Sequence, residues 1–290
     1  MKIICYYHND PDGITAAGIV KKYYNELNNG TKLLLSAIQY GYDYEYAIDK
    51  YSDCDRCIIV DFSFPKEIMN QLYEKYKGNN LIWIDHHQTA MEQNLDLWND
   101  KGLAGKREIG KSGCLLTWEF FFPYRDEPDI LLRVNDLDLW EFKYADTKQF
   151  IEGFCLNIKY PDDDQLQLML NDDCHIYDYI VEQGDVLVTA QQKRVESKYK
   201  HGIDIIFEGH VTRLINSTTD QSQLGEYCYK DNLYPIAMIY SIKDDKVIFQ
   251  LRSNTVDVGT IAKKYLGGGH MFASGFQKDI SFLGELYAKD

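Results

Sequence analysis

The first ninety residues alternate between short apolar runs and longer amphipathic segments. Runs of apolar, partly β-branched residues predict buried strands at residues 2–7, 33–38, 57–62 and 81–84. Helical apolar spacing covers residues 14–27, and Pro65 suits the first turn of a helix that runs to about Lys77. Strands that alternate with helices predict an α/β fold with a mostly parallel sheet and right-handed crossovers.

The pattern changes in the second half of the chain. Ser112 is placed to cap a helix, residues 128–134 predict another, and residues 176–200 form a long helical pattern with a charged far half. Beyond it, strand-like runs at 203–209, 211–216, 234–242 and 246–253 precede a helical segment at 256–266. We therefore predict a first domain over residues 1–185, a linker helix region over 186–203, and a smaller mixed α/β domain over 204–290.

Three of the predicted strands end in acids or histidines. His8, Asp10 and Asp12 follow the first strand, Asp61 ends the third, and the triplet 85–87, Asp-His-His, follows the fourth. The carboxyl ends of parallel strands lie side by side, and open α/β sheets place their active sites at that edge. Charged groups buried there must be paired or ligated. The sequence thus predicts a metal centre assembled from loops that are distant along the chain.

Carboxylates and imidazoles without thiolates suit two divalent cations, with Mn²⁺ favoured over Zn²⁺ and Mg²⁺ as the alternative. Asp61, alone at its strand end, is the expected bridging carboxylate of such a pair. The other expected ligands are His8 and Asp10 for one ion, and Asp12, His86 and a later acid for the other. Asp85 would orient an imidazole from behind the ligands, and His87 would face the substrate.

Charge and cysteine content limit the class of protein. The 290 residues include 31 basic and 45 acidic side chains, a net charge of −14, which disfavours a broad surface for long duplex DNA. Seven cysteines without a framework spacing suit a reducing compartment. Apolar runs stay shorter than the roughly 18 to 20 residues of a membrane span. We expect a cytoplasmic protein without a membrane partner; a homodimer is compatible with the sequence.

Several stretches resemble the ordered motifs of the DHH phosphoesterase superfamily. They are HNDPDG, the lone Asp of IIVDF, WIDHH and the acid of VNDLDLW. The stretch LRSNTVDVGTIAKKYLGGGHMFASGF resembles the DHH-associated C-terminal domain of that superfamily. The resemblance spans nearly the whole chain. Members include RecJ-like single-strand exonucleases, nanoRNases, cyclic dinucleotide phosphodiesterases, phosphoadenosine-phosphate phosphatases and polyphosphatases.

The resemblance also implies roles for individual residues. It implies metal ligation by His8, Asp10, Asp12, Asp61, His86 and Asp136, the last preferred to Asp138. It implies that His87, supported by Asp85, acts at the scissile phosphate. It implies substrate contacts from Arg252, Ser253, Gly267, Gly268, Gly269 and His270. Three consecutive glycines also have a physical account, because backbone amides without neighbouring β-carbons approach an anion closely.

The expected function is hydrolysis of phosphodiester bonds in short single-stranded oligonucleotides or dinucleotides by two divalent cations. The cations would activate water for attack on phosphorus, Arg252 would offset charge on the phosphate oxygens, and His87 or a water molecule would protonate the leaving group. One alternative is a phosphatase for phosphoadenosine phosphate or polyphosphate, and another is a cyclic dinucleotide phosphodiesterase. A nucleotide sensor without catalysis is the third, which the intact set of candidate ligands disfavours.

Overall fold

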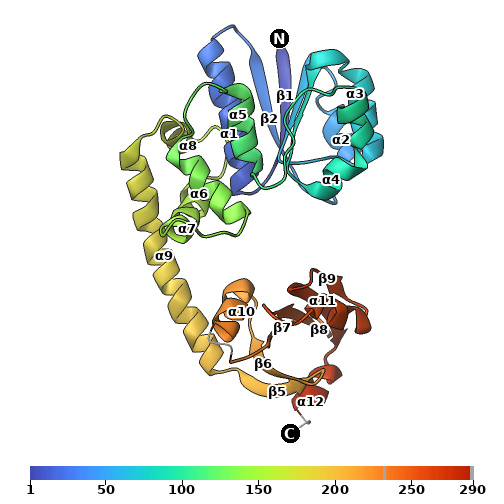
Figure 1. Cartoon of the computed structure of the whole chain (residues 1–290), viewed down its shortest axis with the longest axis vertical. Helices are drawn as coiled ribbons and strands as arrows, with labels where there is room; N and C mark the ends of the chain where they lie inside the picture. Colours follow the sequence, from blue (N-terminus) through green and yellow to red (C-terminus); the bar gives the residue numbers. More distant parts are fainter. Residues whose placement is uncertain (231–232, 288–290) are drawn as a thin grey trace. The chain divides into compact units, whose positions relative to one another are not determined.

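The computed structural model describes residues 1–230 and 233–287 and divides into two compact units, Met1–Val188 and Thr189–Asp290. Figure 1 shows a sheet flanked by helices in the first unit and a second sheet with its own helices in the other. The expected α/β fold with a mostly parallel first sheet and a mixed second sheet is therefore confirmed.

The sheet of the first unit is four-stranded, and all of its strands run parallel. The strand order is β2-β1-β3-β4. The bounds are Lys2–His8 for β1, Lys32–Ile38 for β2, Arg56–Val60 for β3 and Leu81–Ile84 for β4. Strands β1, β3 and β4 need apolar residues at successive positions, because their side chains alternate between two cores, one on each face of the sheet.

Helices cover both faces of this sheet (Figure 1). One face carries α1 (Pro11–Leu27), α5 (Gly113–Phe121), α6 (Asp129–Asp138), α7 (Thr147–Asn157) and α8 (Asp164–Met169), whose apolar residues share one core. The other carries α2 (Tyr44–Asp49), α3 (Lys66–Lys75) and α4 (Gln88–Gln93), followed by a single π-helical turn at Asp96–Asp100. A 3-10 turn, Gly78–Asn80, precedes β4.

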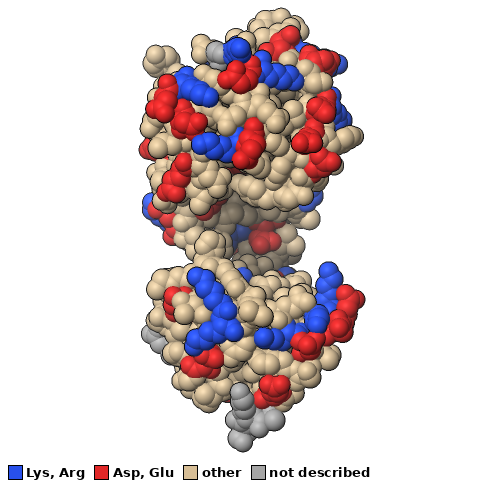
Figure 2. All heavy atoms as spheres, turned by 90° about the vertical axis from the view of Figure 1, so that its right-hand side faces the viewer, with Lys and Arg blue, Asp and Glu red and all other residues tan. Residues whose placement is uncertain are grey.

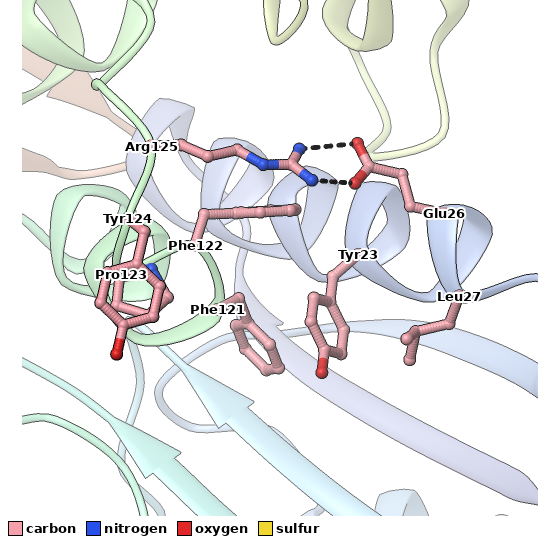
Figure 3. A pocket seen from close by; sticks show the side chains of 8 residues that line it. All are labelled: Tyr23, Glu26, Leu27, Phe121, Phe122, Pro123, Tyr124 and Arg125. Carbon is pink, nitrogen blue, oxygen red and sulfur yellow. Dashed lines mark hydrogen bonds and ion pairs between the residues drawn. The ribbon is translucent and has the colours of Figure 1, made fainter.

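The aromatic residues at the end of α5 pack against α1. The ring of Tyr23 lies 4.9 Å from that of Phe121 and 5.8 Å from that of Phe122. Figure 3 shows these rings beside Arg125, whose guanidinium makes two hydrogen bonds of 3.0 and 2.7 Å to Glu26. These aromatic residues therefore pack the end of α5 against α1.

The second unit contains a six-stranded sheet in the order β5-β6-β7-β8-β10-β9, in which only β6 and β7 pair in parallel among the described strands. The strands are β5 (Ile203–Phe207), β6 (His210–Asn216), β7 (Ile236–Lys243), β8 (Lys246–Arg252), β9 (Gly268–Gly269) and β10 (Ala273–Asp279). The helices are α10 (Gln221–Tyr229), α11 (Val258–Lys264) and α12 (Ser281–Tyr287). The long helix α9 (Cys174–Lys200) contributes residues to both units.

Charge and length of the elements complete the description. Figure 2 shows acidic and basic side chains interspersed on the visible face of the first unit, so no single sign dominates that face. Among the helices of the described residues, none is both long enough and apolar enough to cross a membrane.

Candidate metal centre

The register of the parallel sheet determines where the candidate ligands lie along the strands. Tyr7 of β1 pairs with Val60 of β3, and Val60 pairs with Ile84 of β4. The next residue of each strand, His8, Asp61 and Asp85, therefore leaves the sheet at a common level. The sheet itself thus brings together three segments that lie far apart in the sequence.

Helix α1 starts directly at this edge and adds two carboxylates. Asp10 is the N-cap, and its side chain accepts a hydrogen bond of 2.9 Å from the amide of Gly13. A β-carbon at Gly13 would lie 2.1 Å from the carbonyl oxygen of His8, so a glycine is needed for the helix to begin this close to β1. Asp12, in the first turn, is buried.

Asp61 occupies the centre of the cluster. Its side chain is 2% exposed and its backbone has a positive φ of 52°, a strained conformation for a residue other than glycine. Its Oδ1 lies 3.2 Å from Nε2 of His86, and its Oδ2 lies 4.0 Å from Nδ1 of His8. Neither carboxylate oxygen has a hydrogen-bond partner among the described residues. A buried carboxylate without donors either takes up a proton or is paired with a cation.

Among the residues that the structure describes, three groups of side chains each bring one ligand atom per residue within 4.8 Å of one another. They are His8, Asp10 and Asp61; Asp61, His86 and His87; and Asp12, His86 and Asp138. Asp61 belongs to two of these groups, and so does His86. The arrangement fits two neighbouring cations with a shared carboxylate between them.

The amino end of α5 holds the remaining face of the cluster. Both oxygens of Asp12 accept backbone hydrogen bonds there, 2.6 Å from the amide of Gly113 and 2.7 Å from that of Cys114. A β-carbon at Gly113 would lie 2.6 Å from Cβ of Asp61, so this glycine allows the helix to approach the cluster. The positive end of the helix dipole also favours carboxylates at this place.

Asp85 lies behind the cluster and orients His87. Its Oδ1 accepts hydrogen bonds from the amides of His86 at 2.8 Å and His87 at 3.1 Å, and lies 2.7 Å from Nδ1 of His87. The hydrogen bond to Asp85 raises the pKa of His87 above its ordinary value. The expected support of an imidazole by Asp85 corresponds to this contact, and His87 is 36% exposed at its side chain.

The acids of α6 reverse the preference stated from the sequence. Asp136 is buried and points into its own loop, where it accepts hydrogen bonds from the amides of Lys143 at 2.7 Å and Tyr144 at 3.2 Å and from the hydroxyl of Thr147. Asp138 instead reaches His86, with 3.5 Å between its Oδ2 and Nδ1 of the imidazole. The structure therefore places Asp138 rather than Asp136 in the cluster.

Crowded carboxylates shift the ionisation of the site. Burial, followed by the charges of Asp12 and Asp10, raises the pKa of Asp61 well above its ordinary value. The same causes raise the pKa of Asp138 to about 7. Burial lowers the pKa of His86. The protein alone supplies too little positive charge to hold these carboxylates ionised, so the donor set fits divalent cations.

Two of the substrate residues expected in the second unit differ in their availability. Arg252 is half-buried and donates hydrogen bonds to the carbonyl of Leu251 at 3.0 Å and to the side chain of Gln250 at 3.1 Å. Ser253 is buried, and its hydroxyl donates to the carbonyl of Pro235 at 2.6 Å while accepting from two backbone amides. Ser253 is therefore engaged in shaping its own turn.

The glycine loop serves the packing of β9 on β10. A β-carbon at Gly267 would lie 2.1 Å from the carbonyl oxygen of Gly275, and one at Gly269 would lie 2.6 Å from Cα of Ser274. Only Gly268 of the three has open space around it. His270 follows in an exposed turn. Close approach to the neighbouring strand thus accounts for two of the three glycines, which the sequence argument had assigned to an anion.

Sequence reasoning did not include two features of the site. The first feature is the pair of amides, of Gly113 and Cys114, that hold Asp12. The predicted cap at Ser112 indicated where this helix starts, but not that its first amides face the cluster. The ring of Tyr40 lies 5.8 Å from the ring of His8, and no local pattern in the sequence indicates that contact.

Comparisons with known proteins identify a family and two relatives that this chain resembles. Residues 2–139 match the DHH family, N-terminal domain. The uncharacterized protein R106 of Acanthamoeba polyphaga mimivirus is 26% identical over 94% of this chain and 66% of its own length. Oligoribonuclease NrnB of Bacillus subtilis (strain 168) is 26% identical over 93% of this chain and 71% of its own length. The chain thus spans about two thirds of the length of the first of these relatives.

Solved structures share the fold of the whole chain. A Vibrio pGpG-specific phosphodiesterase, PggH, aligns with a TM-score of 0.57 at 13% identity, covering 100% of this chain and 99% of that one. Exonuclease RecJ bound to manganese aligns with a TM-score of 0.53 at 15% identity, covering 99% and 88%. Both likenesses extend through the second unit. The first unit therefore carries, over residues 2–139, a domain that matches the DHH family, N-terminal domain, with its acid and histidine motifs at one sheet edge.

Proposed function

We propose that this chain, a metal-dependent phosphoesterase of the DHH family, hydrolyses phosphodiester bonds in short single-stranded oligonucleotides or dinucleotides. The proposed cofactor is a pair of divalent cations, Mn²⁺ first and Mg²⁺ second. The observation that carries the proposal is Asp61, whose two buried carboxylate oxygens lack hydrogen-bond donors among the described residues and belong to two groups of candidate ligands.

The proposed ligands combine these groups. His8, Asp10 and Asp61 hold one cation. Asp12, His86 and Asp138 hold the other, and Asp61, 3.2 Å from His86, is shared between the two. His87, which groups with Asp61 and His86, is assigned to the substrate instead. Bound there, the cations would polarise the phosphate and lower the pKa of a water molecule. Asp12 is fixed for this task by the amides at the start of α5, so its carboxylate needs little rearrangement to bind an ion.

His87 is the proposed proton donor for the leaving oxygen. Its Nδ1 is held by Asp85, which leaves Nε2 for the substrate. Because that hydrogen bond raises the pKa of His87, the imidazole keeps its proton at a pH where an ordinary histidine has begun to lose it. Asp85 acts as a positioning residue, since its other contacts are to the backbone amides of the same segment.

The size and kind of substrate rest on three observations. The net charge of −14 disfavours long polyanions, whose binding depends on many basic contacts. One relative that matches 93% of the chain is named an oligoribonuclease, and a structural neighbour is titled a pGpG-specific phosphodiesterase. Arg252 and His270 of the second unit stay proposed substrate contacts, whereas the buried hydroxyl of Ser253 does not favour one.

A substrate panel tests the proposal. Labelled di- to decanucleotides, phosphoadenosine phosphate, cyclic dinucleotides and polyphosphate are incubated with Mn²⁺, Mg²⁺ or a chelator. We expect the shortest linear oligonucleotides to have the highest kcat/KM, and the chelator and the Asp61→Asn variant to abolish turnover. A preference for polyphosphate, phosphoadenosine phosphate or a cyclic dinucleotide would replace the proposed substrate, and turnover that persists in chelator would refute the metal-dependent mechanism.

A further inference from the structure

Two large aromatic side chains lie exposed beside the metal centre. Tyr40, in the turn that follows β2, is 57% exposed, and Trp140, in the turn that follows α6, is 61% exposed. Exposing an aromatic ring to water forgoes the stabilisation that burial provides. The turn of Tyr40 begins after Ile38, which pairs with His8, and the turn of Trp140 begins after Asp138, which contacts His86. Both turns therefore start next to candidate ligands, and a role in binding would explain why the two rings are exposed.

Tyr40 contacts the cluster directly. Its ring lies 5.8 Å from the ring of His8 and 4.9 Å from that of Phe62, the residue after Asp61. More than half of the surface of Tyr40 stays open to solvent.

Trp140 is held at the surface by a strained turn. Its φ is 56° and that of Phe142 is 50°, conformations that are rare for aromatic residues and that persist only where surrounding contacts impose them. Asp136 supplies those contacts through its hydrogen bonds to the amides of Lys143 and Tyr144. The ring of Phe142 supports the indole edge-on, with 4.8 Å between centroids.

Sequence distance fixes how near Trp140 is to the metal centre. It follows Asp138 by two residues, so the two Cα atoms lie within about 7 Å of each other. Asp138 in turn contacts His86. Of the four tryptophans, Trp83 and Trp118 are buried and Trp98 is partly buried, which leaves Trp140 as the exposed one.

The two aromatic residues belong to segments on opposite faces of the sheet. Tyr40 packs on Phe62, which belongs to the core under α2 and α3. Trp140 follows α6, whose apolar residues belong to the core under α1 and α5. The candidate ligands lie at the sheet edge between these two faces. A phosphate held by the metal centre would thus have one aromatic ring on each side.

We propose that Tyr40 and Trp140 are nucleobase-stacking residues that flank the metal centre, so that the preferred substrate carries a base on each side of the scissile phosphate. This inference rests on the proposed function and narrows it to base-bearing diesters, against inorganic polyphosphate. Every nucleobase has a stacking face, so the pair selects nucleotides with little preference among sequences.

The test uses two substrates and matched variants of the full chain. The substrates are a diribonucleotide and its analogue with an abasic ribose in place of one nucleoside, prepared in both positions. The variants are Tyr40→Ala, Tyr40→Phe, Trp140→Ala and Trp140→Phe. The controls are Tyr42→Ala, which is 58% exposed in the same turn as Tyr40, and Tyr124→Ala, which is fully exposed before α6.

Each alanine variant is expected to raise KM for the diribonucleotide by about 5- to 150-fold with kcat changed less than about twofold. The phenylalanine variants keep most of the affinity, and the controls match the wild type. For the abasic analogue that lacks the base stacked on a given ring, the alanine variant of that ring is expected to have the same KM as the wild type. An equal loss on both substrates, or no loss on the diribonucleotide, would overturn the inference.

A binding measurement separates this inference from the proposed function. The protein is titrated with the diribonucleotide in buffer that contains Ca²⁺ in place of Mn²⁺, and tryptophan fluorescence is followed. We expect quenching in the wild type and its loss in Trp140→Phe, because stacking on the exposed indole causes it. If the wild type cleaves no dinucleotide, the proposed function fails, and quenching that depends on Trp140 would still support the stacking role. An unquenched wild type would overturn it.

Discussion

At the scale of single residues, the site is organised by Asp61. It is buried and strained, and it lies between two imidazoles without a hydrogen-bond donor among the described residues. A protein keeps such a residue only where its function repays the strain. Its neighbours are each fixed by other contacts, Asp12 by the start of α5 and His87 by Asp85. Contacts within the protein therefore fix the positions of these ligands.

Asp61→Asn should abolish metal-dependent turnover, with kcat at least about 100-fold lower, while the protein stays folded. The amide removes the shared charged ligand and also relieves repulsion among buried carboxylates. We expect Mn²⁺ to raise the Tm of the wild type but not of the variant. The exposed Asp126→Asn serves as the control. Near-normal turnover in Asp61→Asn would contradict the bridging role.

Substitutions of the two acids of α6 should have different effects, one on metal binding and the other on stability. Asp138→Asn is expected to weaken metal binding and lower kcat while leaving the Tm of the chelated protein equal or higher. Asp136→Asn removes charged acceptors from Lys143 and Tyr144, so we expect about 1–3 kcal/mol of lost stability, roughly 2–10 °C in Tm, with metal binding retained. If Asp136→Asn loses metal binding and Asp138→Asn keeps it, Asp136 is the ligand, as the sequence analysis preferred.

Stability of the chelated protein should fall as the pH rises from about 5 to about 8. Asp61 and Asp138 have pKa values raised in the folded state, to about 7 for Asp138, so the folded chain holds protons there that the unfolded chain releases. The raised pKa values of His8 and His87 act in the same direction, and the lowered pKa of His86 opposes them.

Thermal melts in chelator across this pH range measure the effect. We expect the slope to flatten in Asp138→Asn and to shrink when Mn²⁺ is added, because bound cations replace the protons. A chelated wild type that is more stable at pH 8 than at pH 5 would show that the carboxylates are not crowded as described.

The residue scale also shows where sequence reasoning stopped. His8, Asp61 and His86 could be predicted because each lies at the end of an apolar strand or within two residues after it, and parallel strands end together. Asp136 and Asp138 were not separable, because residues two apart on a helix point about 200° apart and the pattern does not show which side faces the site. Only the packing of α6 decides that Asp138 reaches His86.

At the scale of elements, the start of α5 closes the cluster. Its first two amides hold Asp12, and its first residue, Gly113, touches Asp61. Strands β1 to β4 and helices α1, α5 and α9 were predictable from apolar runs, caps and helical spacing. Strand β10 was not predicted, since ASGFQKD has little intrinsic strand preference and forms a strand through pairing with β8.

Gly113→Ala should damage the site through this element. The added β-carbon would lie 2.6 Å from Cβ of Asp61, so α5 or Asp61 must move. We expect at least about tenfold weaker metal binding and a lower Tm. Gly284→Ala in α12 is the control, because a β-carbon there meets open space and helices favour alanine. Unchanged metal affinity in Gly113→Ala would mean that α5 does not set the position of Asp61.

At the scale of the whole molecule, the chain joins a parallel α/β unit that contains the candidate metal centre to a mixed α/β unit. The net charge of −14 belongs to the protein without ions, and two divalent cations would place positive charge where the substrate phosphate binds. Binding of cations and binding of substrate are therefore expected to be linked in this protein.

The central claim is that one cluster at the sheet edge holds two cations bridged by Asp61. Equilibrium titration of the chelated wild-type chain with Mn²⁺, followed by turnover of a diribonucleotide at each point, tests it most directly. We predict two ions per chain, activity that develops only as the second site fills, and loss of the paired binding in Asp61→Asn. Full activity with a single bound ion, or two ions bound equally well by the variant, would contradict the account.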